Sequence, residues 1–319
     1  MSRRVQLLLL WSALLLIGAV LLTWSLQSVP FADLGRVLSE LQAWQIALLI
    51  LVNVALVFLF PLRWSQILRA QSFKISYLQL TRYRLLAFAI SYFTPGQHFG
   101  GEPMQVLSLR NRHGISGSAA LASVTLDKVI ELFANFAVLA LGLALVLSSG
   151  MLAALPLAQA LPLSLGLLLV PALYLGMLRG GWLPFGALTK RLVGRLADGL
   201  RNAERQLGKL SRQQPRLLWQ GLLIAALVWV VQIFEIWLTL VFLGLNLTAM
   251  ELSLIIVAGR LALFAPTPGA LGALEASQIL AMHGLGYDPA YGLSLGLLIR
   301  ARDIIFGLTG LLLGTLKRS

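Results

Sequence analysis

The sequence contains no cysteine and little charge, and both absences narrow what the protein can be. Without cysteine it has neither a disulfide framework nor a thiolate metal site. Charged residues make up 12% of the 319 residues, whereas 58% are hydrophobic. Soluble domains carry about twice that share of charged residues, so the composition excludes an ordinary soluble protein.

Long apolar runs recur along the whole chain, and they predict an all-α polytopic membrane protein. The short segments of alternating polarity that are typical of a membrane β-barrel are missing. The first apolar run, which follows MSRR, is too long for a signal peptide, so we expect an uncleaved span. About six full spans are predicted, at residues 5–25, 44–62, 118–148, 161–178, 217–243 and 291–315.

Two short blocks interrupt the apolar sequence in the same way. TPGQHFGGE at 94–102 and TPGALGALE at 267–275 both fit T-P-G-x5-E. Proline removes a backbone donor and glycine frees the backbone dihedrals, so each block ends one helix and allows another to begin. The apolar arms beside each block cover only about 16–24 Å of the roughly 30 Å hydrocarbon core. Each pair of arms therefore predicts a re-entrant helical hairpin with its tip near mid-membrane.

The order of these elements predicts an inverted repeat within one membrane domain, residues 1–319. The repeats cover about 1–150 and 161–316 and are joined through 151–160. Each reads as span, span, hairpin, span, in opposite directions across the membrane. With both chain ends in the cytoplasm, most basic residues fall on the cytoplasmic side, as the positive-inside rule requires. We therefore expect a multi-pass protein of the bacterial inner (plasma) membrane. The alternative that two matched Pro-Gly kinks arose by chance stays open.

The net charge of +13 is concentrated in the predicted cytoplasmic segments, so we expect no nucleic-acid partner. One such segment, about 186–214, is basic and amphipathic. It predicts a helix lying on the inner leaflet and attracting anionic lipids, although a plain connector fits equally well. The leucines near one helical face of this segment are Leu188, Leu192, Leu196, Leu200, Leu207 and Leu210.

The two breaks are the first candidates for a functional site. A helix that restarts at mid-membrane presents unpaired N–H groups and the positive end of its dipole to an anion. Glu102 and Glu275 fall in the first turns of the restarted helices. Each carboxylate would cap its helix, bind a cationic headgroup or carry a proton, and these readings stay open. The other candidates at the breaks are Thr94, Gly96, His98, Thr267 and Gly269.

Charged residues in the predicted spans, together with Arg260 just before the second break, form a second group of candidates. Ionisable groups at membrane depth usually face a partner, a bundle interior or a water-filled cavity. They predict either a structural ion-pair network or cations that receive an anionic headgroup. These residues are Asp127, Lys128, Glu131, Arg260, Arg300, Arg302 and Asp303. His98 and Glu102 lie four residues apart, which is too few ligands for a metal site, so we expect neither a metal nor another cofactor.

The same blocks carry a resemblance to a known family. TPGQHFGGEPMQVLSLR, ASVTLDKVIELF, APTPGALGALEA and GLGYDPAYGLSLGLLIRARD resemble the membrane region of the lysylphosphatidylglycerol synthase family, also called the flippase-like domain. In two-part members that region is joined to a cytosolic aminoacyl-transferase domain and is taken to move the aminoacylated lipid between leaflets. The 319 residues contain no counterpart of that soluble domain, and Gln97 and Gln105 stand where the family often has arginine. The positions implied by the resemblance are Glu102, Asp127, Glu131, Arg260, Glu275 and Arg300.

These features predict a lipid transporter rather than an enzyme. Its cargo would be a lipid or polyprenyl-linked amphiphile with a polar head, whose identity the sequence does not specify. One alternative is an accessory membrane subunit that works with a synthase or glycosyltransferase. Another is an intramembrane lipid-modifying enzyme that uses Asp127, Glu131 and His98 as acid–base groups. A homodimer also stays open.

Overall fold

The computed structural model describes residues 3–94, 100–148, 160–185 and 194–315. Within these ranges the chain forms helices and contains no strand, which confirms the all-α prediction. The elements are α1 Arg3–Gln27, α2 Phe31–Ser39, α3 Ala43–Ala70, α4 Tyr77–Phe93, α5 Glu102–His113, α6 Gly117–Ser148, α7 Ala160–Arg179, α9 Gly194–Gln213, α10 Pro215–Phe242, α11 Ala249–Ala262, the 3-10 turn η3 Pro268–Ala270, α12 Ala273–Gly284 and α13 Pro289–Thr315.

Four described helices are long and apolar enough to cross a membrane, namely α3, α6, α7 from Leu161 onward, and α10. The bent pair Leu15–Gln27 and Phe31–Ser39, which turns by 79°, is a fifth candidate. These helices confirm a multi-pass membrane protein. The sixth predicted span, α13, is a helix of 27 residues, but it carries Arg300, Arg302 and Asp303 in its middle. These central charges indicate that one side of α13 faces a polar interior.

The hairpin arms form close to their predicted positions, as α4 with α5 and α11 with α12. Local signals explain where these short helices begin and end. The Ser76 hydroxyl accepts a hydrogen bond from the Gln79 N–H at the start of α4, and Thr248 with Glu251 forms a capping box on α11. Gly114 ends α5 in the left-handed conformation.

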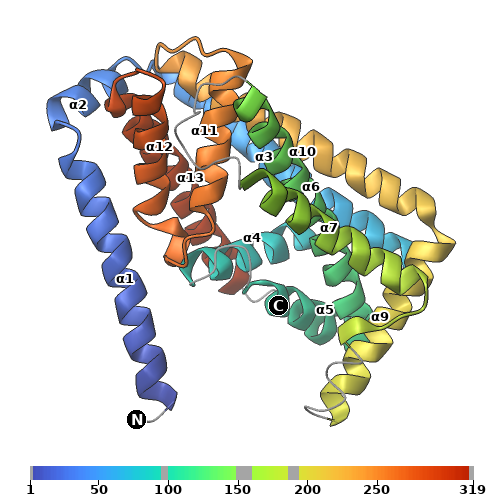
Figure 1. Cartoon of the computed structure of the whole chain (residues 1–319). Helices are drawn as coiled ribbons and strands as arrows, with labels where there is room; N and C mark the ends of the chain where they lie inside the picture. The colour runs from blue at the N-terminus through green and yellow to red at the C-terminus, as the bar shows by residue number, and fades with distance from the viewer. Residues whose placement is uncertain (1–2, 95–99, 149–159, 186–193, 316–319) are drawn as a thin grey trace.

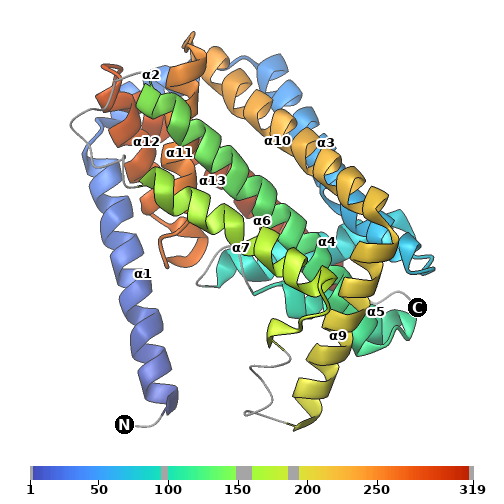
Figure 2. The same ribbon diagram turned by 45° about the vertical axis from the view of Figure 1, so that its right-hand side comes forward.

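Figures 1 and 2 show how the hairpins are placed among the long helices. The helices α3, α6 and α10 run obliquely side by side, and α11 and α12 stand together beside α13. The helix α4 crosses the middle of the molecule, where it packs most extensively on α13. The N-terminal half of α1 extends away from the other helices, and α1 packs on α12 and η3.

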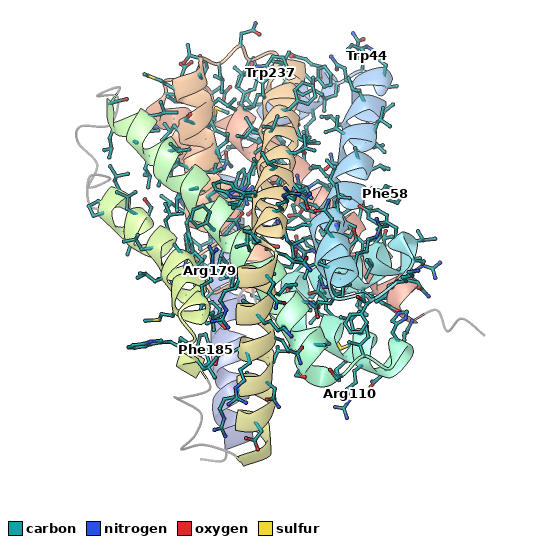
Figure 3. All side chains as sticks on the ribbon, turned by 90° about the vertical axis from the view of Figure 1, so that its right-hand side faces the viewer. Trp44, Phe58, Arg110, Arg179, Phe185 and Trp237 are labelled. Carbon is teal, nitrogen blue, oxygen red and sulfur yellow. The ribbon has the colours of Figure 1, made fainter. Side chains whose placement is uncertain are left out.

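The two ends of the long-helix bundle differ in side-chain character (Figure 3). Trp44 and Trp237 lie toward one end of α3 and α10, and Arg110 lies toward the opposite end. Both tryptophans are exposed, as side chains of an interfacial belt would be.

The basic segment was expected to lie on the lipid surface through its apolar face, and α9 differs from that expectation. Ala203, Leu207 and Leu210 are buried against α3, α6, α7 and α10. A Cβ on Gly208 would come within 2.6 Å of the Leu178 carbonyl oxygen, so α9 lies very close to α7. The apolar face of α9 is therefore part of the protein core. Leu188 and Leu192 lie outside the described residues.

Candidate functional site

A cavity of about 280 Å³ lies among α3, α4, α5, α6, α10, α11, α12 and α13. Part of its wall is apolar and includes Phe60, Phe88, Val228 and Phe306. Five basic and five acidic residues also line it, so its formal charge is balanced and each group must be judged by its own partner. A site with both charged and apolar walls suits an amphiphile. The charged lining residues are Arg63, Arg84, Glu102, Asp127, Lys128, Glu131, Glu235, Arg260, Arg302 and Asp303.

One ion-pair network joins α3, α4 and α6. Asp127 and Glu131 are four residues apart and therefore share one face of α6. Asp127 Oδ1 accepts a hydrogen bond from Arg63 Nε at 2.6 Å, and Asp127 Oδ2 accepts one from Arg84. Arg84 also donates to Glu131, so a single guanidinium spans both carboxylates. Such charge-assisted pairs are stronger than neutral hydrogen bonds, and they hold the three helices together.

The first break is linked to this network through Glu102. Lys128 Nζ lies 3.1 Å from Glu102 Oε1 and 2.9 Å from Glu131 Oε1. Glu102 Oε2 accepts a hydrogen bond from the Gly100 N–H at 2.9 Å, so the carboxylate caps the chain before α5 and also binds a cation. Gly101 makes this position reachable, because a Cβ there would overlap the Ala87 backbone of α4.

The second break is closed by Arg300. Glu275, which is completely buried, binds the Arg300 guanidinium through both of its oxygens. Arg300 Nη1 donates to the Gly269 carbonyl at 3.0 Å, and Nη2 donates to the Ala270 carbonyl at 3.3 Å. Gly269 adopts a φ of +56°, which favours glycine. The guanidinium therefore satisfies the carbonyls that the break frees from helical bonding.

Arg300 also brings the two hairpins together. Tyr92, near the end of α4, accepts a hydrogen bond from Arg300 Nη1 at 3.1 Å. Its ring lies against Gly269, where an added Cβ would come within 2.9 Å of the ring. The end of α4 accordingly approaches the turn between α11 and α12 in both views (Figures 1 and 2). Arg300 thus binds a residue of each hairpin, Tyr92 of the first and Gly269 of the second.

Two N–H groups of the first break, which were expected to stay unpaired, have partners within the protein. The Gly100 N–H is bound by Glu102, and the Gly101 N–H donates to the Ser91 hydroxyl at 2.9 Å. At the second break, the groups that converge on Arg300 are carbonyls and a carboxylate. Nearby side chains satisfy these backbone groups because a polar group left unpaired in a membrane protein costs several kcal/mol.

A third group of charges lines the cavity from α10, α11 and α13. Arg302 Nη1 lies 2.9 Å from Glu235 Oε2, and Arg302 also binds Asp303 at 2.9 Å. Arg260 lies over the Trp229 ring, with 4.2 Å between the guanidinium carbon and the ring centroid. In the network of α3, α4 and α6, the carboxylates come from α6 and the arginines from the two earlier helices. Here the carboxylate of Glu235 comes from α10, and Arg302 comes from the later helix α13.

Most of the charged candidates meet in or beside the cavity. Glu275 and Arg300 lie beside its lining, and Thr94 and Thr267 instead donate to carbonyls of their own segments, at Ile90 and Leu271. Gly96 and His98 lie outside the described residues. Cavity candidates brought together are Glu102, Asp127, Lys128, Glu131, Arg260, Arg302 and Asp303.

Sequence reasoning missed several partners of these residues. Arg63 and Arg84 were not among the candidates, although both bind carboxylates inside the bundle. Glu235 had a usable signal, since it is the only acidic residue in the apolar stretch 217–243. Tyr92 and Trp229 had none, because aromatic residues are common in membrane helices.

Comparison with known proteins agrees with the resemblance seen in the sequence. Residues 10–310 match the family described as Lysylphosphatidylglycerol synthase TM region. The chain is also 24% identical over 296 residues to a "UPF0104 membrane protein" of Methanothermobacter thermautotrophicus, which covers 87% of this chain and 86% of that relative. The family match extends over nearly the whole chain and includes both breaks and every cavity residue. The protein therefore belongs to the lysylphosphatidylglycerol synthase TM region family.

Proposed function

We propose that the protein moves a lipid or polyprenyl-linked amphiphile with a polar head across the membrane by an alternating-access mechanism. The observation that carries this proposal is the position of Arg300, which binds Tyr92 of one hairpin and Gly269 of the other. A cavity with charged and apolar walls lies beside this contact. Secondary transporters place their binding sites where broken helices meet between repeats.

The proposal includes inverted repeats at about 1–150 and 161–316, with six spans and two re-entrant hairpins. A repeated ion pair supports it. Glu102 binds Lys128, which follows 26 residues later (128 − 102), and Glu275 binds Arg300, which follows 25 residues later (300 − 275). In both halves an acidic residue stands three positions after the cation.

The two breaks are held with different strength, and we assign the moving role to the first. The Glu102–Lys128 pair faces the cavity, with 25% and 17% of the two side chains exposed, whereas Glu275 and Arg300 are 0% and 10% exposed. The removal of one partner from a buried pair is strongly destabilising, and this cost falls as the pair becomes more accessible to water. The first hairpin would therefore rearrange around the cargo while the second stays anchored.

Transport is tested by reconstitution in liposomes that contain fluorescent lipids with different headgroups. A membrane-impermeant quencher reports the fraction of lipid in each leaflet. Wild type should accelerate transbilayer movement of at least one headgroup class, and Glu102→Gln should slow it. Arg216→Gln, at an exposed position near the start of α10, is the control. Absence of acceleration over a broad lipid panel would contradict the proposal.

A role as an accessory subunit is the second candidate, and α9 favours it. Its apolar side is buried in the protein, so Arg205, Lys209 and Arg212 form a basic face that is anchored and exposed. Such a face would attract an acidic surface of a synthase or glycosyltransferase. Co-purification that is lost when these three positions are changed to glutamine would support this role. Retained transport by the purified protein alone would argue against it.

A further inference from the structure

Arg260 differs from every other cation in the cavity. Arg63, Arg84, Lys128 and Arg302 each lie within 4.0 Å of a carboxylate oxygen. In the part of the chain that the structure describes, Arg260 has no such partner, and its contact is the ring of Trp229. A charge without a counter-ion at membrane depth is expensive, so it indicates a site for a partner that comes from outside the chain.

The comparison with Arg84 makes the difference sharper. Arg84 lies on α4 and Arg260 on α11, and both helices are the first arms of their hairpins. Arg84 binds two carboxylates of α6. Around Arg260 the charged groups that influence it are Arg302, Asp303, Glu235 and Glu131, but none of the described carboxylates forms an ion pair with it. Among the described residues, the second hairpin thus presents a guanidinium that has no ion-pair partner.

The geometry of the Trp229 contact leaves Arg260 able to bind an anion. Trp229 is buried, and its indole N–H donates to Asn135 Oδ1 at 3.2 Å, which fixes the ring between α10 and α6. A guanidinium over an aromatic ring uses its flat face. In that arrangement the N–H groups lie at the edge of the guanidinium, where they suit two oxygens of one oxyanion.

We propose that Arg260 binds the phosphate group of an amphiphile whose hydrocarbon part contacts the apolar wall of the cavity. That this binding serves transport rests on the proposed function. The binding of phosphate by Arg260 does not. The apolar lining near α10 and α13, including Val228 and Phe306, supplies the surface for the hydrocarbon part. A free phosphate ion would use the guanidinium alone, and it would therefore bind more weakly than a phospholipid.

Binding is measured by isothermal titration of the delipidated protein in a neutral detergent. The probes are dioctanoyl phosphatidylglycerol, inorganic phosphate and dioctanoylglycerol, which has the same tails without phosphate. Wild type should bind the phospholipid at least tenfold more tightly than either other probe. Equal affinity for the phospholipid and dioctanoylglycerol would overturn the assignment. Equal affinity for inorganic phosphate would overturn the role of the apolar wall and leave a phosphate site only.

Variants of Arg260 test the residue itself. Arg260→Gln should weaken phospholipid binding at least tenfold, and Arg260→Lys should be intermediate because it keeps the charge but loses the planar edge. Arg216→Gln, at an exposed arginine that belongs to neither proposed site, is the matched control and should bind like wild type. In the absence of lipid, Arg260→Gln should melt no lower than wild type, since no carboxylate loses its partner. An Arg260→Gln protein that binds within twofold of wild type contradicts the proposal. If this variant does not fold, Arg260→Lys decides, and wild-type affinity in that variant contradicts the proposal.

The outcome for the binding site is separable from the outcome for transport. A wild-type protein that binds the phospholipid through Arg260 but moves no lipid in liposomes supports the site and contradicts the proposed function. A protein that moves lipid equally well with Arg260→Gln supports transport and contradicts a role for the Arg260 site in it, while the binding measurement decides the site itself.

Discussion

Arg300 on α13 and Tyr92 on α4 are 208 positions apart in the sequence and 3.1 Å apart between Nη1 and the phenolic oxygen. The same nitrogen lies 3.0 Å from the Gly269 carbonyl oxygen. Because Glu275 occupies the remaining edge of the guanidinium, the arginine has partners on every side. It therefore acts as a structural link between the hairpins rather than as a free binding group.

The first prediction concerns the stability of this link. Arg300→Ala leaves the buried Glu275 carboxylate without a counter-ion, and we expect a loss of about 3–5 kcal/mol of stability. Tyr92→Phe removes one hydrogen bond and should lower stability by only about 1 kcal/mol. Thermal unfolding of both variants in the same detergent gives the comparison. If Arg300→Ala had the same melting temperature as Tyr92→Phe, the buried Glu275–Arg300 pair would not be what stabilises the second break.

The second prediction separates the two hairpin arginines. Arg84→Gln deprives Asp127 and Glu131 of a shared partner, and we expect a stability loss of about 2–3 kcal/mol. Arg260→Gln removes no ion pair within the described part of the chain, so its melting temperature should stay at or above that of wild type. Differential scanning fluorimetry of the two variants checks the ranking. The reverse ranking would mean that the Trp229 contact stabilises the fold more than the network on α6 does.

The third prediction uses the different exposure of the two glutamates. Glu102→Gln should reduce lipid movement with little effect on stability, because its partner Lys128 keeps Glu131. Glu275→Gln should mainly affect stability. It should lower the melting temperature, because it leaves Arg300 without a carboxylate in a buried site. Flux and melting temperature are measured on the same preparations. Parallel losses in both variants would remove the distinction between a moving break and an anchored break.

The sequence predicted local features of this site better than its partners. The two breaks could be predicted because proline and glycine act on the backbone where they stand. Asp127 and Glu131 could be placed on one face because helical periodicity fixes their relation. Arg63 could not be distinguished from a cytoplasmic arginine, since both follow an apolar run. Its pairing depends on how α3 packs against α6, and no local signal encodes that contact.

The Arg260 site shows the same limit. Its position before the second break made it a candidate, but the missing counter-ion became visible only when the neighbours of α11 were known. Trp229 and Asn135 come from two other helices and are 94 positions apart in the sequence. A single sequence without aligned relatives carries no information about such a contact.

The fourth prediction tests the orientation of the chain. Because the protein has no cysteine, single cysteines can be introduced without removing others. Glu40 and Lys209 are both exposed, and the proposed topology places them on opposite sides of the membrane. A membrane-impermeant maleimide should label Glu40→Cys in intact cells and Lys209→Cys only after permeabilisation. Labelling of both positions, or of Lys209→Cys alone, in intact cells would contradict the orientation.

The last prediction concerns motion at the two breaks. If the first hairpin moves and the second is anchored, backbone amides in the first turns of α5 should open more readily than those of α12. Hydrogen–deuterium exchange of the protein in nanodiscs compares peptides covering Glu102–Leu109 with peptides covering Ala273–Leu280. We expect faster exchange in the first peptide and a selective slowing there when a transported lipid is added, because bound cargo stabilises the conformation that it contacts. Arg300→Ala should raise exchange in the second peptide until the two become similar, since it removes the anchor of that break. Slower exchange in α5 than in α12 of the wild type would reverse the assignment of the moving hairpin.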